Sequence, residues 1–272
     1  MDLNSKDIQL QYEGFLNTPL LWESDTIFEL QQLELTKEKS SKFNSCIAKN
    51  LRLGKRVERF ISHELQQYTS IKILAENIQI QNGKTTVGEI DFIIQQNNTP
   101  IHLEVMFKFY LYDETVGETE LEHWIGPNRK DSLVAKLTKL KEKQFPLIYK
   151  EQTLPFLKSI NINVKDIQQQ VYFKAQLFVP FQLRNNSFKL INNNCIKGFY
   201  ISFNELSKFD NCKFYIPSKI NWLQETQTQI NWKTYTQILP KIETEIKNKT
   251  SPLCWLKQPN GEVYKIFIVW WE

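Results

Sequence analysis

The chain has 272 residues, of which 41% are hydrophobic and 24% are charged, and it carries a formal net charge of +4. These values are typical of a soluble globular protein that is long enough to bury a substantial core. A charge of +4 over such a surface makes a weak field, so it permits a polyanionic partner without demanding one.

The cysteines and the apolar segments argue against several classes of protein. The four cysteines are widely spaced and form no CxxC pair, which gives no support for a zinc site or a disulfide framework. The first ten residues are polar and lack the apolar segment of a signal peptide. The longest apolar run, IFIVWW at 266–271, is too short to span a bilayer. We therefore expect a reduced, cytoplasmic protein with no membrane partner.

Helical spacing dominates the first 68 residues. Residues 1–40 place apolar side chains at roughly helical spacing, with a break at 17–19, so two helices are expected there. Residues 50–68, NLRLGKRVERFISHELQQY, predict an amphipathic helix in which Glu58 lies beside the apolar stripe.

Strands and one basic helix follow. We expect strands at 71–81, 85–96 and 100–112, joined by tight turns, then a helix at 129–143 and a strand at 171–181. The rest of the chain predicts short strands, a helix at 232–247 and a closing hairpin around 259–261. The fold class is therefore α/β (α+β). We divide it into a helical extension at 1–48, a core at 49–182 and an α+β extension at 183–272.

The hairpin at 87–113 carries an unusual number of ionisable groups. Alternation along its two strands puts Glu89 and Asp91 on one face of the first strand, and His102, Glu104 and Lys108 on one face of the second. Two interpretations are open. Antiparallel sheets often have one solvated face with cross-strand ion pairs. Alternatively, acidic residues placed within β-forming segments indicate a site, which Glu58 of the preceding helix could reach.

These segments resemble a known superfamily. GEID followed by HLEVMFK on the next strand is similar to the PD-(D/E)XK nucleases, whose core has the order α-β-β-β-α-β. LGKRVERF, NIQI, GEIDFII, HLEVMFKFYL, WIGPNRKDSLVAKL and VYKIFIVWW also resemble the DUF1853 family of uncharacterised bacterial proteins, over about residues 10 to 272. That family implies a fold and no established biochemical role.

The resemblance to the nucleases implies a metal site. Asp91 and Glu104 match the residues that hold Mg²⁺ or Mn²⁺ in such enzymes, and the carbonyl of Val105 matches the usual third ligand. Glu58 matches a glutamate at the rim of the site, and Glu89 and His102 are possible helpers. The metal ion would neutralise charge on the scissile phosphate and lower the pKa of an attacking water.

The expected catalytic lysine is displaced in this chain. The superfamily pattern places a lysine two residues after the glutamate, where this sequence has Met106. Lys108 is the first alternative, because it lies on the same strand face and its stem could fold back about 7 Å along the strand. Lys136, on the following helix, is the second.

The basic helix at 129–143 offers a phosphate-binding surface. Its start, GPNRKDS, could present backbone N–H groups to a phosphate, and its lysines could follow a nucleic-acid backbone. The residues expected to take part are Asn128, Arg129, Lys130 and Lys136. The alternative is a solvated helix face whose lysines interact with the helix dipole.

Three functions remain open. The first is a Mg²⁺-dependent nuclease-like phosphodiesterase acting on nucleic acid, with DNA as the first substrate and RNA as the second. The second is a module that retains the nuclease fold, lacks catalysis, and binds nucleic acid or a protein partner. The third is a purely structural adaptor, which would have no metal affinity.

Overall fold

A computed structural model describes residues 3–23, 26–35, 42–48 and 50–271. The chain is a mixed α/β protein that divides into two compact units. Unit 1 consists of Met1–Pro19, Lys108–Val134 and Ala175–Glu272, and unit 2 of Leu20–Phe107 and Ala135–Lys174. Strands β3 (Thr99–Tyr112) and β5 (Gln168–Pro180) contribute residues to both units. The division into three parts expected from the sequence stays a prediction.

Unit 2 is built on helix α2 (Leu53–Leu65) and a sheet in the order β1-β2-β3-β5. Strands β1 (Ile71–Asn82), β2 (Thr85–Gln96) and β3 pair antiparallel. Gly83, with a φ of 61°, supplies the left-handed backbone that the tight β1–β2 turn requires. The helix and the three strands predicted from the sequence are confirmed.

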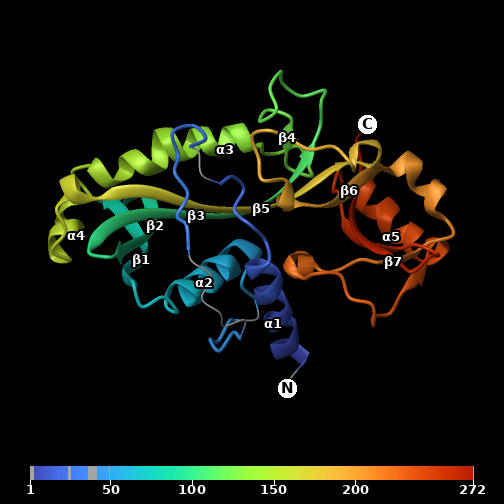
Figure 1. Cartoon of the computed structure of the whole chain (residues 1–272), viewed down its shortest axis with the longest axis horizontal. Helices are drawn as coiled ribbons and strands as arrows, with labels where there is room; N and C mark the ends of the chain where they lie inside the picture. Colours follow the sequence, from blue (N-terminus) through green and yellow to red (C-terminus); the bar gives the residue numbers. More distant parts are fainter. Residues whose placement is uncertain (1–2, 24–25, 36–41, 49, 272) are drawn as a thin grey trace. The chain divides into compact units, whose positions relative to one another are not determined.

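Short helical segments follow β3 and cover the sheet of unit 2. They are α3 (Leu133–Lys139), the π-helix η1 (Leu140–Gln144), η2 (Phe145–Tyr149), α4 (Leu154–Ser159) and η3 (Val164–Asp166). Figure 1 shows α2 on one side of the unit 2 strands and the run from α3 to α4 on the other. Leu147, Ile148 and Leu157 of this run pack with Ile90 and Ile93 of β2. The hairpin is therefore covered on both faces.

Two helix predictions are corrected. Helix α1 (Leu3–Leu16) forms as expected, but the described residues between 17 and 35 form no second helix. Instead, the backbone N–H groups of Leu21 and Leu33 donate to carbonyls of β5 at 2.8 Å each, so their side chains pack beside a strand. The basic helix starts at Leu133 instead of 129, because Gly126 donates to the Asp131 carbonyl and closes a turn before it.

Unit 1 contains a second set of strands, in the order β5-β6-β10-β9-β7-β8. These are β6 (Ile196–Ser202), β7 (Lys213–Tyr215), β8 (Lys233–Thr234), β9 (Leu253–Lys257) and β10 (Val263–Val269), and β4 (Trp124–Ile125) pairs with the end of β3. The β5–β6 and β6–β10 pairs are parallel and the others antiparallel, so the sheet is mixed. The expected closing hairpin, β9–β10, is confirmed.

Helix α5 (Tyr235–Lys247) completes the core of unit 1. Its buried Ile238 and Ile242 pack against Phe214, Leu256 and Ile266 of the strands. The remaining elements are the 3₁₀ helices η4 (Phe181–Leu183), η5 (Asn193–Cys195), η6 (Phe203–Phe209) and η7 (Lys219–Leu223). Among the described helices, none is long and apolar enough to cross a membrane.

Candidate functional site

The β2–β3 ladder opens where the two acidic residues lie. The pairing of the two strands runs from Gln96–Thr99 to Phe92–Leu103. At the next position Asp91 Oδ2 accepts the backbone N–H of Val105 at 3.0 Å. Continuing the register of the pair would put Asp91 opposite Glu104, so the two carboxyl groups meet at the opened end of the ladder.

Glu104 is completely buried, and so is His102 on the same strand face. Glu104 Oε1 lies 3.0 Å from His102 Nε2, and Glu104 Oε2 accepts a hydrogen bond from the carboxamide nitrogen of Gln144 in η1. The other carboxamide atom, Gln144 Oε1, is buried and has no hydrogen-bond partner in the described part of the chain. The solvated interpretation of this strand face is therefore wrong for both residues.

The tautomer of His102 follows from its second contact. Gln169 Nε2 donates to the Phe145 carbonyl at 2.7 Å and lies 3.0 Å from His102 Nδ1. An amide nitrogen is only a donor, so Nδ1 accepts, and Nε2 carries the proton that it donates to Glu104. Burial lowers the pKa of His102 to about 4, which keeps the ring neutral. The structure thus places His102 where it orients the Glu104 carboxyl.

The two carboxyl groups are poorly ionised without a cation. Burial raises the pKa of Asp91 to about 7, the charge of Glu104 adds to the rise, and the Val105 N–H opposes it. Burial likewise raises the pKa of Glu104 to about 8, against hydrogen bonding with Asp91 and the positive charge of Lys136. A buried acidic pair of this kind retains a proton near neutral pH, and a bound cation would replace that proton.

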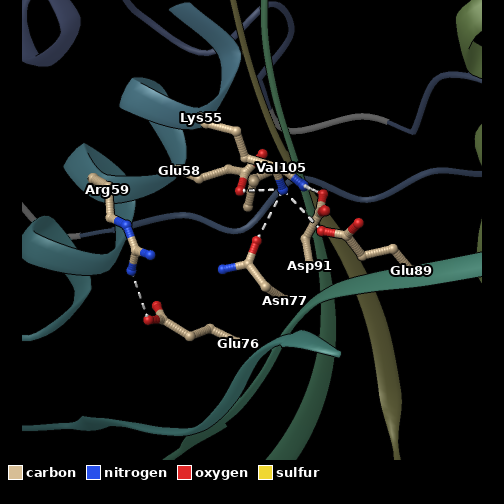
Figure 2. Close-up of polar contacts among 8 residues, drawn as sticks. All are labelled: Lys55, Glu58, Arg59, Glu76, Asn77, Glu89, Asp91 and Val105. Atoms are coloured by element: carbon tan, nitrogen blue, oxygen red, sulfur yellow. Dashed lines mark hydrogen bonds and ion pairs between the residues drawn. The ribbon is translucent and has the colours of Figure 1, made fainter. Parts of the chain in front are cut away.

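Lys55 is the residue of the site that the sequence interpretation missed. Figure 2 shows its ammonium group between side chains from α2, β1 and β2. Nζ lies 2.8 Å from Glu58 and from Glu89, and 3.1 Å from the Asn77 side-chain oxygen. An ammonium group has three N–H donors, so all three are used. The positive charge of Lys55 also lowers the pKa of Asp91 against the larger effect of burial.

Glu58 and Glu89 are brought to the site by this lysine. Burial raises the pKa of Glu58, the Lys55 contact opposes the rise, and the charges of Asp91 and Glu89 add to it. A further ion pair, Arg59 with Glu76 at 3.1 Å, joins α2 to β1 (Figure 2). The available signal was the i,i+3 spacing of Lys55 and Glu58, which puts both on one helix face, but their meeting with Glu89 depends on packing.

The predicted catalytic lysines differ in their surroundings. Lys108 belongs to unit 1, where its Nζ pairs with Asp131 at 2.8 Å. Met106, at the position expected for lysine, is 6% exposed. Lys136 belongs to unit 2, and its charge lowers the pKa of Glu104. Of the two predicted lysines, Lys136 is the one that acts on the carboxyl pair.

The other residues predicted to bind phosphate lie in unit 1 and hold a turn together. Arg129, with a φ of 55°, pairs with Asp113 at 2.6 Å, and its guanidinium lies 4.7 Å from the centre of the Trp271 ring. Asn128 accepts the backbone N–H of Ser251 through its side chain at 2.8 Å. Lys130 is exposed. Asn128 and Arg129 thus have structural partners, and their phosphate-binding role stays a prediction.

Comparison with known proteins identifies the family. The family model described as a domain of unknown function, DUF1853, matches residues 14–269. The chain belongs to the DUF1853 family. No curated protein and no solved structure matches it. Membership in DUF1853 supplies no activity, so the function must be argued from the site.

Proposed function

We propose that this DUF1853 chain is a nuclease-like phosphodiester hydrolase in which Asp91 and Glu104 bind a divalent metal ion, Mg²⁺ or Mn²⁺. The nucleic-acid substrate is DNA in the first instance, and the fold is the PD-(D/E)XK type. The observation that carries the proposal is the meeting of these two carboxyl groups where the β2–β3 ladder opens. The order of α2, β1, β2, β3, α3 and β5 along the chain supports it.

The donor atoms fit a hard cation. Asp91 and Glu104 offer carboxylate oxygens. The backbone N–H of Val105 already contacts Asp91, and the carbonyl of the same residue would be the third ligand. Gln144 Oε1 is a buried oxygen beside Glu104 that has no hydrogen-bond partner among the described residues, as expected at a site that takes a cation or its water. The raised pKa values of both carboxyls also indicate that positive charge is lacking.

The residues around the carboxyl pair would have different roles in the reaction. When bound, the metal ion would neutralise negative charge on the phosphate and lower the pKa of the attacking water. Lys55 offsets the charges of Glu58 and Glu89, which would otherwise repel an anionic substrate. Lys136 adds positive charge near Glu104. His102 holds the Glu104 carboxyl in one orientation, as partners of metal ligands commonly do.

One observation favours the second candidate, a nuclease-fold module that binds without cleaving. Glu104 is 0% exposed, and both of its oxygens already have hydrogen-bond partners. A metal ion would have to reach a carboxyl group that is closed off from solvent and already accepts two hydrogen bonds. Met106 in place of the expected lysine points in the same direction. Such a module would retain its nucleic-acid or protein partner but show no metal-dependent cleavage.

A cleavage assay separates the two candidates. Wild-type protein is incubated with single-stranded DNA, duplex DNA and RNA, in Mg²⁺, in Mn²⁺ and in a chelator. The proposal expects metal-dependent cleavage that Asp91→Asn and Glu104→Gln each reduce by about 10²-fold or more, the scale of losing one transition-state charge contact. Asp131→Asn is the matched control, since it removes an exposed carboxylate of unit 1. Cleavage that survives Asp91→Asn would refute the assignment.

A further inference from the structure

The strands β9, β7 and β8 form an edge of unit 1 that carries positive charge only. Their sequences are LCWLK, KFY and KT, so they contain three lysines and no acidic residue. Lys213 begins β7, Lys233 begins β8 and Lys257 ends β9. Because β7 pairs antiparallel with both neighbours, the three lysines gather at one end of this edge. Lys233 is the cross-strand partner of Phe214 and so lies on the other face of the edge. We call Lys213, Lys257 and the nearby Trp232 the basic end.

Two of these lysines face each other directly. Lys213 is the cross-strand partner of Lys257 on one side and of Thr234 on the other. Cross-strand partners share a face, and like charges in this position are destabilising. Within the part of the chain that the structure describes, no ion pair joins Lys213, Lys233 or Lys257 to an acidic residue. An anion bound between Lys213 and Lys257 would relieve this repulsion.

Trp232 adds an aromatic surface on the same face. It lies two residues before Thr234, and Lys257 Nζ lies 5.9 Å from the centre of its ring. Its indole N–H donates to the Thr228 carbonyl at 3.0 Å, which holds the ring in place. Trp232 is only partly buried, unlike Trp255 at 1% exposure. A planar ring beside one ammonium group, on a strand face that also carries Lys213, matches the chemistry of a base attached to phosphates.

The opposite face of this edge belongs to the core. Phe214 and Leu256 are cross-strand partners, are both fully buried, and pack in the cluster that includes Ile238 and Ile242 of α5. The basic end is therefore carried by a packed sheet, and a ligand would meet side chains whose backbone is already fixed.

We propose that the basic end binds single-stranded nucleic acid, with Lys213 and Lys257 on consecutive phosphates and a base stacked beside Trp232. The ligand class rests on the proposed function, and the strandedness goes beyond it. A duplex offers phosphates but keeps its bases stacked on one another, so only a single strand can use both the lysines and the indole. Binding at the basic end needs no metal ion and no cleavage.

The test is equilibrium binding of a fluorescein-labelled oligothymidylate in chelator, using the Asp91→Asn/Glu104→Gln protein so that nothing is cleaved. We expect Lys213→Glu/Lys257→Glu to weaken binding at least tenfold. It should also lower the dependence of log affinity on log salt by about 1.4, from about 0.7 per phosphate contact on a single strand. Trp232→Leu should weaken binding about tenfold without changing the salt dependence. The control is Lys241→Glu/Lys247→Glu, the same charge change on exposed positions of α5.

The outcomes are distinct. Loss confined to the basic-end variants supports the proposal, and it would do so even if the chain cleaves nothing. The proposal is overturned by any of four results: no binding of the oligonucleotide, equal loss in the α5 control, tighter binding of a duplex, or an unchanged affinity of Trp232→Leu. Preferential binding to anionic lipid vesicles over the oligonucleotide would also overturn it.

Discussion

Replacing Glu104 by glutamine should make the folded protein less sensitive to alkaline pH. The pKa of Glu104 rises from 4.5 in the unfolded chain to about 8 in the folded protein. At pH values between these two pKa values, the Glu104 carboxyl is ionised in the unfolded chain and protonated in the folded protein. The contribution of Glu104 to stability is therefore complete below pH 4.5 and is lost as the pH rises toward 8. At 1.36 kcal/mol for each pKa unit, the loss has an upper limit of roughly 4–5 kcal/mol.

Glutamine at position 104 resembles the protonated acid and cannot ionise. Its amide group would face Gln144, whose unpartnered Oε1 can turn to accept it. Urea unfolding in chelator, at pH 5 and at about pH 8.5, gives the free energy of unfolding of both proteins. We compare the free energy of unfolding of Glu104→Gln with that of the wild type at each pH. We expect this difference to be more favourable to the variant at about pH 8.5 than at pH 5, by several kcal/mol. A difference between the two proteins that is the same at both pH values would refute the reasoning.

Three further predictions follow from the contacts. The nitrogen chemical shifts of the imidazole rings should show His102 as the neutral Nε2–H tautomer at pH 6, because Gln169 donates to Nδ1 and the pKa of His102 is lowered to about 4. An imidazolium or the Nδ1–H tautomer would contradict this. The chain has three histidines, so comparison with His102→Gln assigns the signals. Lys55→Met should lower the free energy of unfolding by about 1 kcal/mol in low salt and by less in high salt, since the ion pairs of Lys55 are partly exposed. A loss unaffected by salt would mean that Lys55 contributes through packing and not through charge. Gly88→Ala should lower the free energy of unfolding, measured in urea, by about 1–3 kcal/mol, because the new Cβ would lie 2.7 Å from Leu147. Adding Leu147→Ala should remove most of the cost of the clash, and losses that simply add would contradict it.

The hairpin was predictable because its signal is local. Alternating β-forming residues bounded by Asn-Gly and by Asn97 and Asn98 fix two strands and their turns without any distant partner. The same local reading failed between residues 17 and 35. There the apolar side chains have helical spacing, but the backbone of Leu21 and Leu33 bonds to β5, more than a hundred residues away. The spacing of apolar residues alone cannot distinguish an amphipathic helix from an extended segment that bonds to a distant strand.

The site was predictable in part for a similar reason. Asp91 and Glu104 are joined by the register of one hairpin, so a local pattern brings them together. The environment of Glu104 depends on Gln144 and, through His102, on Gln169, which arrive from segments whose position no periodicity encodes. Lys55 was missed because its partners come from three elements, and only packing of α2 against the sheet shows that they converge.

The central claim is that Asp91 and Glu104 bind a divalent cation, and calorimetric titration with Mn²⁺ tests it most directly. We predict saturable binding to the wild-type protein, accompanied near pH 7 by proton release, because the pair retains a proton when no cation is bound. Asp91→Asn/Glu104→Gln should abolish both the binding and the proton release, while Asp131→Asn retains them. Binding that is absent from the wild type, or that is unchanged in the double variant, would contradict the account.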